Sequence, residues 1–150
     1  MSMRILRPGL LTTVQDRGRF GLQHIGVVPC GAMDPVALEL ANGLVGNGDD
    51  AALLEITLLG PEIQFDSDAL VALCGAEMDA RLGGMPMPAN RPVLVQKGTV
   101  LKTRRATLGS RAYLAVAGGI ALPPVLGSRS TYMPATFGGL QGRQLRAGDI

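Results

Sequence analysis

Glycine and proline interrupt this sequence at short intervals, and their spacing constrains the fold more than any other feature. The 150 residues include 21 Gly and 10 Pro, and no collagen-like period explains them. Between these breaks lie short apolar segments, which predict strands joined by frequent turns. Hydrophobic residues make up 47% of the chain and aromatic residues only 3%. We therefore expect one mainly β domain over residues 1–150, with an aliphatic core.

The middle of the sequence shows this pattern most clearly. Residues 53–58 and 62–65, on either side of Gly60-Pro61, predict a β-hairpin. Residues 69–74 form a continuous apolar segment that predicts a strand ending at Gly75-Ala76. Several short strands of this kind are typical of a barrel or a sandwich rather than of a parallel β/α array.

One segment has the signature of a helix. Asp34 is a good N-cap and Pro35 suits the first helical position, so the sequence predicts a helix over about residues 35–45. The Gly-Asn-Gly run at 46–48 is a typical end. Asn42 lies inside this helix, where asparagine is unfavourable. Its position predicts either a tertiary hydrogen bond or a contact with a ligand.

A strand running into a polar loop is the most suggestive local pattern. Residues 113–116 have no polar break, as expected when both faces of a strand are covered. Gly118-Gly119 and Pro123-Pro124 then force the backbone out of the sheet. The loop that follows predicts an anion or small-molecule site, although an ordinary polar turn has the same composition. Its polar residues are Ser128, Arg129, Ser130 and Thr131.

Four charged residues and one histidine are further candidates. Arg17 and Arg19, next to Asp16, form either a surface ion-pair cluster or a planar fork for a carboxylate or phosphate. His24 is the only histidine and is either a hydrogen-bonded loop residue or a general acid or base. Glu55 interrupts an apolar strand, so it either faces solvent or is a buried carboxylate with a raised pKa.

Charge and cysteine content narrow the class of function. Residues 101–150 carry seven basic groups and one acid, whereas residues 1–100 carry seven basic and eleven acidic groups. A basic C-terminal third predicts an anionic ligand or an acidic partner rather than nucleic acid, because Lys and aromatic residues are scarce. Cys30 and Cys74 are expected to be free thiols in a cytoplasmic protein, since no export signal is visible. We expect no metal site, no membrane segment and no Walker-type nucleotide loop.

Six blocks of the sequence, taken in order, resemble one family. They are TVQDRGRFGLQHIGV, GAMDPVALELANGLVGN, AALLEITLLGP, GSRAYLAVAGGI, VLGSRSTY and FGGLQGRQLRAGD. The family is variously called allophanate hydrolase subunit 2, biotin-dependent carboxyltransferase-like protein, KipA or the C component of 5-oxoprolinase. The resemblance covers nearly all of residues 4–149. It implies a cyclophilin-like β-barrel, and it identifies this chain with the N-terminal half of a longer family chain.

The resemblance also implies a complex with a companion, of the type called allophanate hydrolase subunit 1, KipI or the B component of 5-oxoprolinase. In the 5-oxoprolinase branch, the complex uses ATP to open 5-oxoproline to glutamate, and this is the function that we expect. The alternatives are a biotin-dependent carboxyltransferase acting on urea or a similar amide, and a non-enzymatic regulatory module that binds a KipI-like partner. We expect enzymatic activity only in the complex, because a site shared with the rest of a family chain is incomplete here.

The family blocks also select the residues that we expect to function. Arg129 is expected to bind a substrate or phosphate anion, with Asp16 and His24 as further catalytic candidates. Substrate or anion binding is predicted for Arg19, Ser128, Ser130, Thr131, Asn42 and Glu55. Both chemistries develop negative charge near an amide-like acceptor, which is where guanidinium and other fixed donors are useful.

Overall fold

A 17-residue strand, β8 (Val100–Val116), organises the sheet in a computed structural model that describes residues 2–150. The other elements, in chain order, are β1 (Met3–Arg7), β2 (Leu11–Gln15), the 3-10 turn η1 (Gln23–Ile25), α1 (Pro35–Leu44), β3 (Leu53–Thr57), β4 (Glu62–Phe65), β5 (Ala69–Leu82), β6 (Met85–Pro86), β7 (Pro92–Val95) and the 3-10 turn η2 (Met133–Ala135). The expectation of a mainly β fold with one principal helix is confirmed. None of the helices in residues 2–150 is long and apolar enough to span a membrane.

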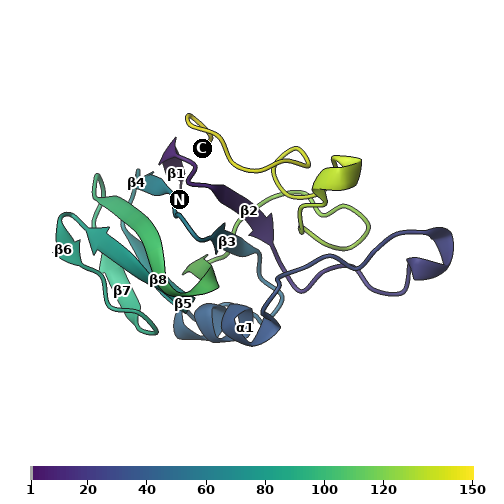
Figure 1. The fold of residues 1–150 in the computed structure, drawn as a ribbon, viewed down its shortest axis with the longest axis horizontal. Coiled ribbons are helices and arrows are strands. Elements are labelled where there is room, and N and C mark those ends of the chain that lie inside the picture. Colours follow the sequence, from purple (N-terminus) through teal and green to yellow (C-terminus); the bar gives the residue numbers. More distant parts are fainter. Residues whose placement is uncertain (1) are drawn as a thin grey trace.

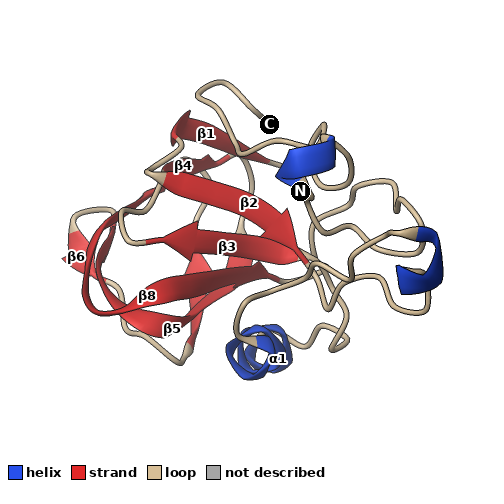
Figure 2. Ribbon diagram, turned by 45° about the vertical axis from the view of Figure 1, so that its right-hand side comes forward, coloured by secondary structure: helices blue, strands red, loops and turns tan. Residues whose placement is uncertain are grey.

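The strands form one curled, antiparallel sheet. The order β1-β4-β8-β3-β2 defines its main path, and β5 joins β8 to β6 and β7. Figures 1 and 2 show the sheet bending round into a half-barrel, with β1 and β2 as the two end strands of its main path. The C-terminal segment lies along both edges. The Gly148 N–H donates to the Ile5 carbonyl at 2.8 Å, and the Leu145 N–H donates to the Thr12 carbonyl at 2.9 Å.

Two predictions about turns were wrong. β3 and β4 do not form a hairpin, because they follow one another along the same side of β8, with a bridge between Leu59 and Arg105 where they meet. β5 does not end at Gly75 but continues past it with a shift in register, and Gly75 has a φ of +90°. Glycine and proline mark a local distortion of a strand as readily as a reversal, so their positions alone do not distinguish a bulge from a hairpin.

Both faces of the central strands are covered. Inside the half-barrel, Leu54, Ile63, Leu101 and Leu114 belong to a large aliphatic cluster. On the outer face, a second cluster packs beneath α1 and contains Leu38, Leu53, Cys74, Tyr113 and Ala115. Successive residues of β8 therefore enter different clusters, which explains why its C-terminal part is apolar without alternation.

Helix α1 is fastened at both ends. The Asp34 side chain accepts a hydrogen bond from the Ala37 N–H at 3.0 Å, as predicted for an N-cap. Beyond the other end, the Asn47 side-chain amide donates to Asn42 and to the Val116 carbonyl, while fully buried Asn42 donates to the Ala51 carbonyl at 2.8 Å. The tertiary hydrogen bond predicted for Asn42 is confirmed.

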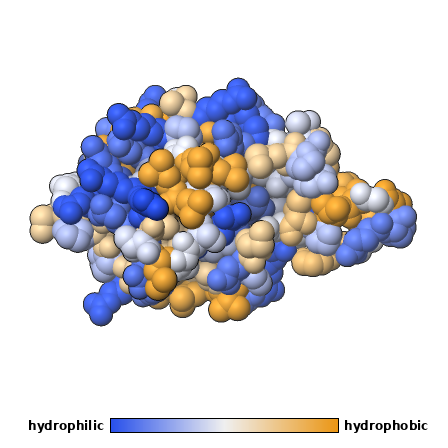
Figure 3. Space-filling view, viewed as in Figure 1, coloured by the Kyte–Doolittle hydropathy of each residue, from blue (hydrophilic) through white to orange (hydrophobic). Residues whose placement is uncertain are grey.

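A narrow arm projects from the half-barrel, on the right of Figure 1. It leaves the body after Asp16, turns at η1 and returns before α1, and its two sides are joined by the Arg19 N–H and the Pro29 carbonyl at 2.7 Å. Residues 20–33 contain no Asp, Glu, Lys or Arg. Figure 3 shows apolar atoms along the arm, and the exposed large apolar side chains in this segment are Phe20, Ile25, Val28 and Met33.

Candidate functional site

The predicted polar loop is attached to Asp16. The Asp16 carboxylate accepts hydrogen bonds from the Ser128 hydroxyl at 2.6 Å, the Ser130 hydroxyl at 2.5 Å and the backbone N–H groups of Gly18 and Arg129. Asp16 is only 5% exposed. The structure therefore brings together two segments that are more than 100 residues apart in the sequence.

These contacts keep Asp16 ionised. Burial by itself raises the pKa of this carboxyl, but hydrogen bonds from Ser128, Ser130, Arg129 and Gly18 together outweigh it, and the pKa of Asp16 is lowered. A buried carboxylate with four donors is a strong anchor for the chain that supplies them.

The remaining donors of the loop are also used inside the protein. The Thr131 hydroxyl and N–H both donate to the Val14 carbonyl, and the Ser130 N–H donates to the Ser128 hydroxyl oxygen. Arg129 lies partly buried, with its Nε donating to the Leu122 carbonyl at 2.7 Å. Among the donors of this loop, only the terminal amino groups of Arg129 lack a hydrogen bond within residues 2–150. Anion binding therefore stays a prediction for Ser128, Arg129, Ser130 and Thr131.

Arg19 lies beneath the same loop. It is 2% exposed, its Nη2 donates to the Ser130 carbonyl at 2.5 Å, and its guanidinium lies 4.8 Å from the centre of the Phe137 ring. This geometry combines a charge-assisted hydrogen bond with a cation–π contact. Within the described residues, Arg19 therefore binds the chain itself rather than facing a solvent-filled site.

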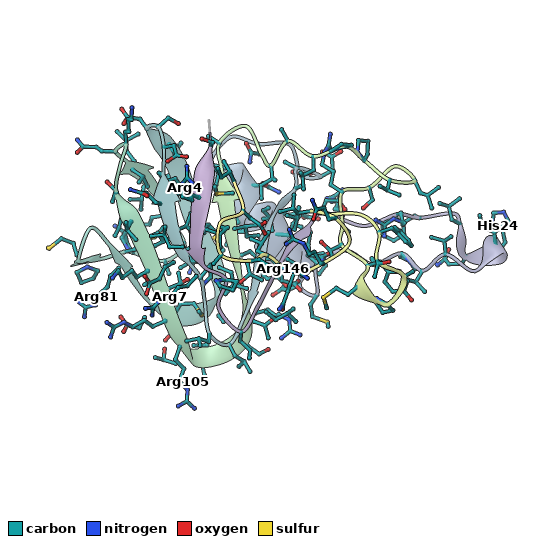
Figure 4. All side chains as sticks on the ribbon, turned by 90° about the horizontal axis from the view of Figure 1, so that it is seen from above. Arg4, Arg7, His24, Arg81, Arg105 and Arg146 are labelled. Carbon is teal, nitrogen blue, oxygen red and sulfur yellow. The ribbon has the colours of Figure 1, made fainter. Side chains whose placement is uncertain are left out.

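The other loop candidates lie elsewhere. Arg17 forms a surface ion pair with Glu39 at 2.5 Å, which matches the surface alternative. His24 lies at the tip of the arm, far from the half-barrel (Figure 4). The basic residues of the C-terminal third do not form one patch: Arg105 and Arg146 lie well apart in Figure 4, and Arg143 is paired with Asp149 at 2.8 Å.

A second polar cluster lies on the outer face of the sheet, beside the beginning of α1. Glu55 and Tyr113 are directly opposite each other on β3 and β8. The Tyr113 hydroxyl donates to the Glu55 carboxylate at 2.9 Å and accepts from the Asp34 N–H at 2.8 Å. The same carboxylate oxygen of Glu55 accepts from the Met33 N–H at 2.7 Å. Burial and the Glu55 charge raise the pKa of Tyr113, so the phenol stays protonated.

Arg111 completes this cluster. Its Nε lies 3.7 Å from the second carboxylate oxygen of Glu55, and both side chains are mostly buried. Arg111 also lines an open hollow with a volume of about 470 Å³, together with Met33, Asp34, Gly75, Glu77 and Asn90. The cluster thus places a carboxylate, a phenol and a guanidinium behind and beside a concave surface, which makes it our candidate functional site.

Sequence reasoning selected Glu55 but missed Tyr113 and Arg111. A tyrosine in an otherwise aliphatic buried strand needs a partner for its hydroxyl, and this signal could have identified Tyr113. Arg111 lies two residues earlier on the same strand, so it shares the face of Tyr113. The segment Ala32–Asp34 links the two clusters, because the Ala32 N–H donates to the Asp16 carbonyl and the Met33 N–H to Glu55.

Known proteins resemble this chain over nearly its whole length. It is 46% identical to the C component of the 5-oxoprolinase of Escherichia coli (strain K12) over 147 residues, which are 98% of this chain and 47% of that protein. It is 42% identical to a urea amidolyase of Lachancea kluyveri over 99% of this chain and 8% of that protein. The chain therefore spans about half of the first relative and a small part of the second.

Solved structures agree with the sequence comparison. The crystal structure of the K. lactis urea amidolyase matches with a TM-score of 0.96 and 42% identity, covering 98% of this chain and 9% of that chain. The family described as "Carboxyltransferase domain, subdomain A and B" matches residues 25–150. This chain belongs to that carboxyltransferase domain family.

Proposed function

We propose that this chain contributes to an ATP-dependent 5-oxoprolinase-type complex that opens a lactam, converting 5-oxoproline to glutamate. The observation that carries the proposal is the 46% identity to the C component of 5-oxoprolinase over 98% of this chain. The Glu55–Tyr113–Arg111 cluster supports it, because opening a lactam places negative charge on a carbonyl oxygen, where the Arg111 guanidinium would stabilise it while the Tyr113 hydroxyl holds Glu55.

Carboxyl transfer to urea or a similar amide is the second candidate function. It is supported by the family match and by the 42% identity to urea amidolyase over 99% of this chain. Biotin enters only in this alternative. Lactam opening and carboxyl transfer share an amide-like acceptor, so the same donor cluster suits both.

ATP would supply the free energy for lactam opening in the complex. The backbone of the Ser128–Thr131 loop does not offer a phosphate site of its own, because the N–H groups of all four residues are already bonded to Val125, Asp16, Ser128 and Val14. The role proposed for this chain is therefore to bind and orient the amide-bearing substrate, and not to bind ATP through this loop.

We further propose that the chain works beside a companion of the type called allophanate hydrolase subunit 1, KipI or the B component of 5-oxoprolinase. The E. coli relative is named as one subunit of its enzyme, which supports this. The outer part of the arm, residues 20–31, is our candidate contact, because it projects from the body and exposes Phe20 and Ile25 by 70% and 62%. An apolar segment without charged side chains is suited to a partner surface that is also uncharged and apolar.

The test is to co-express the full-length protein with its companion subunits and to measure ATP hydrolysis that depends on 5-oxoproline. Turnover of 5-oxoproline without biotin supports the main proposal, whereas biotin-dependent carboxylation of urea supports the alternative. Stable assembly without either activity contradicts both and favours the regulatory module. Arg129→Ala in the same assay tests the loop prediction, since an unchanged rate removes Arg129 from the set of functional residues.

A further inference from the structure

The hollow beside α1 is created by an irregularity in two long strands. Gly75 of β5 pairs with Ala112, and Glu77 pairs with Leu108, so one residue of β5 faces three residues of β8. Gly75 and Gly109 adopt φ values of +90° and +80° at this bulge. Bulges bend strands and redirect side chains, and they are common next to binding sites. Here the extra residues carry Arg111 to the wall of the hollow.

Arg111 has donors that the protein leaves unused. Its Nε is buried without a hydrogen-bond partner in residues 2–150, and the 3.7 Å to Glu55 is too long for a hydrogen bond. None of its terminal amino groups is bonded to another described residue, and 27% of the side chain is exposed. Glu55 therefore balances the charge of Arg111 while leaving its planar donor fork available.

The single positive charge of Arg111 is more than balanced by the carboxylates around the hollow. Glu55 lies next to Arg111, and the Asp34 carboxylate is bonded at the N-terminus of α1, where negative charge is stabilised. Among the residues that line the hollow, exposed Glu77 is the remaining ionisable group. The walls thus present guanidinium donors, a carboxylate acceptor and the side-chain amide of Asn90. This combination is complementary to a neutral group that has both a carbonyl oxygen and an N–H.

From this geometry we infer that the hollow between the beginning of α1 and the β5–β8 bulge binds a small amide or ureido group, with the Arg111 guanidinium donating to its carbonyl oxygen. The volume of about 470 Å³ lies within the range of small-molecule sites. The identity of this amide rests on the proposed function. It is the lactam of 5-oxoproline in the main proposal and urea in the alternative.

Glu55 is a positioning residue in this site. Its carboxylate is held by the Tyr113 hydroxyl at 2.9 Å and by the Met33 N–H at 2.7 Å. These two bonds fix the negative charge at one place, and that charge orients Arg111 without contacting the ligand. Tyr113 in turn is held by the Asp34 N–H, so the order of α1 and the orientation of Arg111 are connected.

The experiment uses the full-length protein assembled with its companion subunits. Binding of 5-oxoproline and of urea is measured by calorimetry without ATP, for the wild type and for Arg111→Ala, Arg111→Lys and Glu55→Gln. Arg105→Ala is the matched control, because Arg105 is an exposed residue of the same strand and points away from the body (Figure 4). Steady-state kinetics then separate KM from kcat for whichever substrate is turned over.

We expect Arg111→Ala to weaken binding about 10- to 100-fold, the effect of losing a hydrogen bond from a charged donor. Arg111→Lys keeps the charge but not the fork, so its effect is smaller. Added methylguanidine should partly restore binding to Arg111→Ala. Glu55→Gln should raise KM and leave kcat nearly unchanged, and Arg105→Ala should behave as the wild type.

Whichever of 5-oxoproline and urea the wild-type complex binds more tightly identifies the amide that the hollow takes. Wild-type affinity for either probe in a correctly assembled Arg111→Ala complex overturns the inference, as does a wild-type complex that binds neither probe. Turnover by the wild type tests the proposed function separately from the site. A complex that turns over substrate and whose binding is unchanged in Arg111→Ala refutes only the site. If the complex binds urea but not 5-oxoproline, and this binding requires Arg111, the site is supported and lactam opening is contradicted.

Discussion

Replacing Asp16 by Asn tests whether its carboxylate holds the late loop in place. Three donors bond to Oδ1, namely the Gly18 N–H and the Ser128 and Ser130 hydroxyls, while the Arg129 N–H bonds to Oδ2. An Asn side chain with its oxygen in the Oδ1 position places its amino group against the Arg129 N–H. One bond is lost, two buried donors oppose each other, and the three remaining bonds lose their charge assistance.

The expected cost follows from these contacts. A bond to a charged group contributes about 1.5–3 kcal/mol and a neutral one about 0.5–1.5 kcal/mol. The neutral Asn side chain avoids the cost of burying a charge, which offsets part of the loss. We therefore expect Asp16→Asn to lower the free energy of unfolding by about 2–4 kcal/mol. For a chain of this size that corresponds to a fall in Tm of roughly 6–12 °C. Asp50→Asn, at an exposed position, should change stability by less than about 0.5 kcal/mol.

The effect of Asp16 must also depend on pH. Because the folded state lowers its pKa, the carboxylate contributes its full stabilisation above the unfolded pKa of about 3.9 and loses it as pH falls through the folded value. Urea and thermal unfolding followed by circular dichroism at pH 7 and pH 3 would measure this. A gap between wild type and Asp16→Asn that is below about 0.5 kcal/mol, or that is equal at both pH values, would refute the reasoning.

Four further predictions use the same unfolding and assembly measurements. Gly138→Ala should destabilise by more than about 2 kcal/mol, because its Cβ would lie 2.0 Å from the Ser130 carbonyl oxygen at a φ of +71°. Gly84→Ala, also at positive φ but in open space, should cost only about 1 kcal/mol. Asn47→Ala should cost about 2–3 kcal/mol, since it removes bonds to Asn42, Val116 and Gly118; no change would mean that these bonds do not hold α1. Combined Phe20→Ser and Ile25→Ser should leave folding unchanged but reduce co-purification of the companion subunit, and full recovery would exclude the arm as the contact. His24→Ala should leave stability unchanged, because the side chain is exposed; a loss of turnover in the complex would support its predicted catalytic role.

Some features of this protein were readable from local sequence because local physics produces them. The Asp34 cap and Pro35 begin α1 where predicted, since both act within one turn of helix. The unbroken apolar run of residues 113–116 indicated cover on both faces, and the structure places barrel core on one side and α1 on the other. Asparagine is unfavourable inside a helix, and for that reason a tertiary hydrogen bond or a ligand contact was expected at Asn42.

Other features depended on which distant segments meet, and local sequence carries little information about that. Gly60-Pro61 predicted a hairpin, but β8 is long enough to pair with β3 and β4 in succession, so the same residues mark a bend. A period of two indicates which face a side chain occupies, but not which strand lies beside it. For that reason Arg111 and Glu55, which lie 3.7 Å apart at their closest charged atoms, could not be paired in advance.

The sequence by itself determined a β-rich chain with one capped helix, frequent turns and membership of a recognisable family. Propensity and turn chemistry depend on residues that are close together in the sequence, and the order of the motifs is visible in the sequence directly. Only the tertiary structure decided what the polar residues do. It bonded the hydroxyls of Ser128 and Ser130 to Asp16 and left the fork of Arg111 open to a hollow. The physical reason is that a donor's role depends on whether a partner from elsewhere in the chain has already taken it.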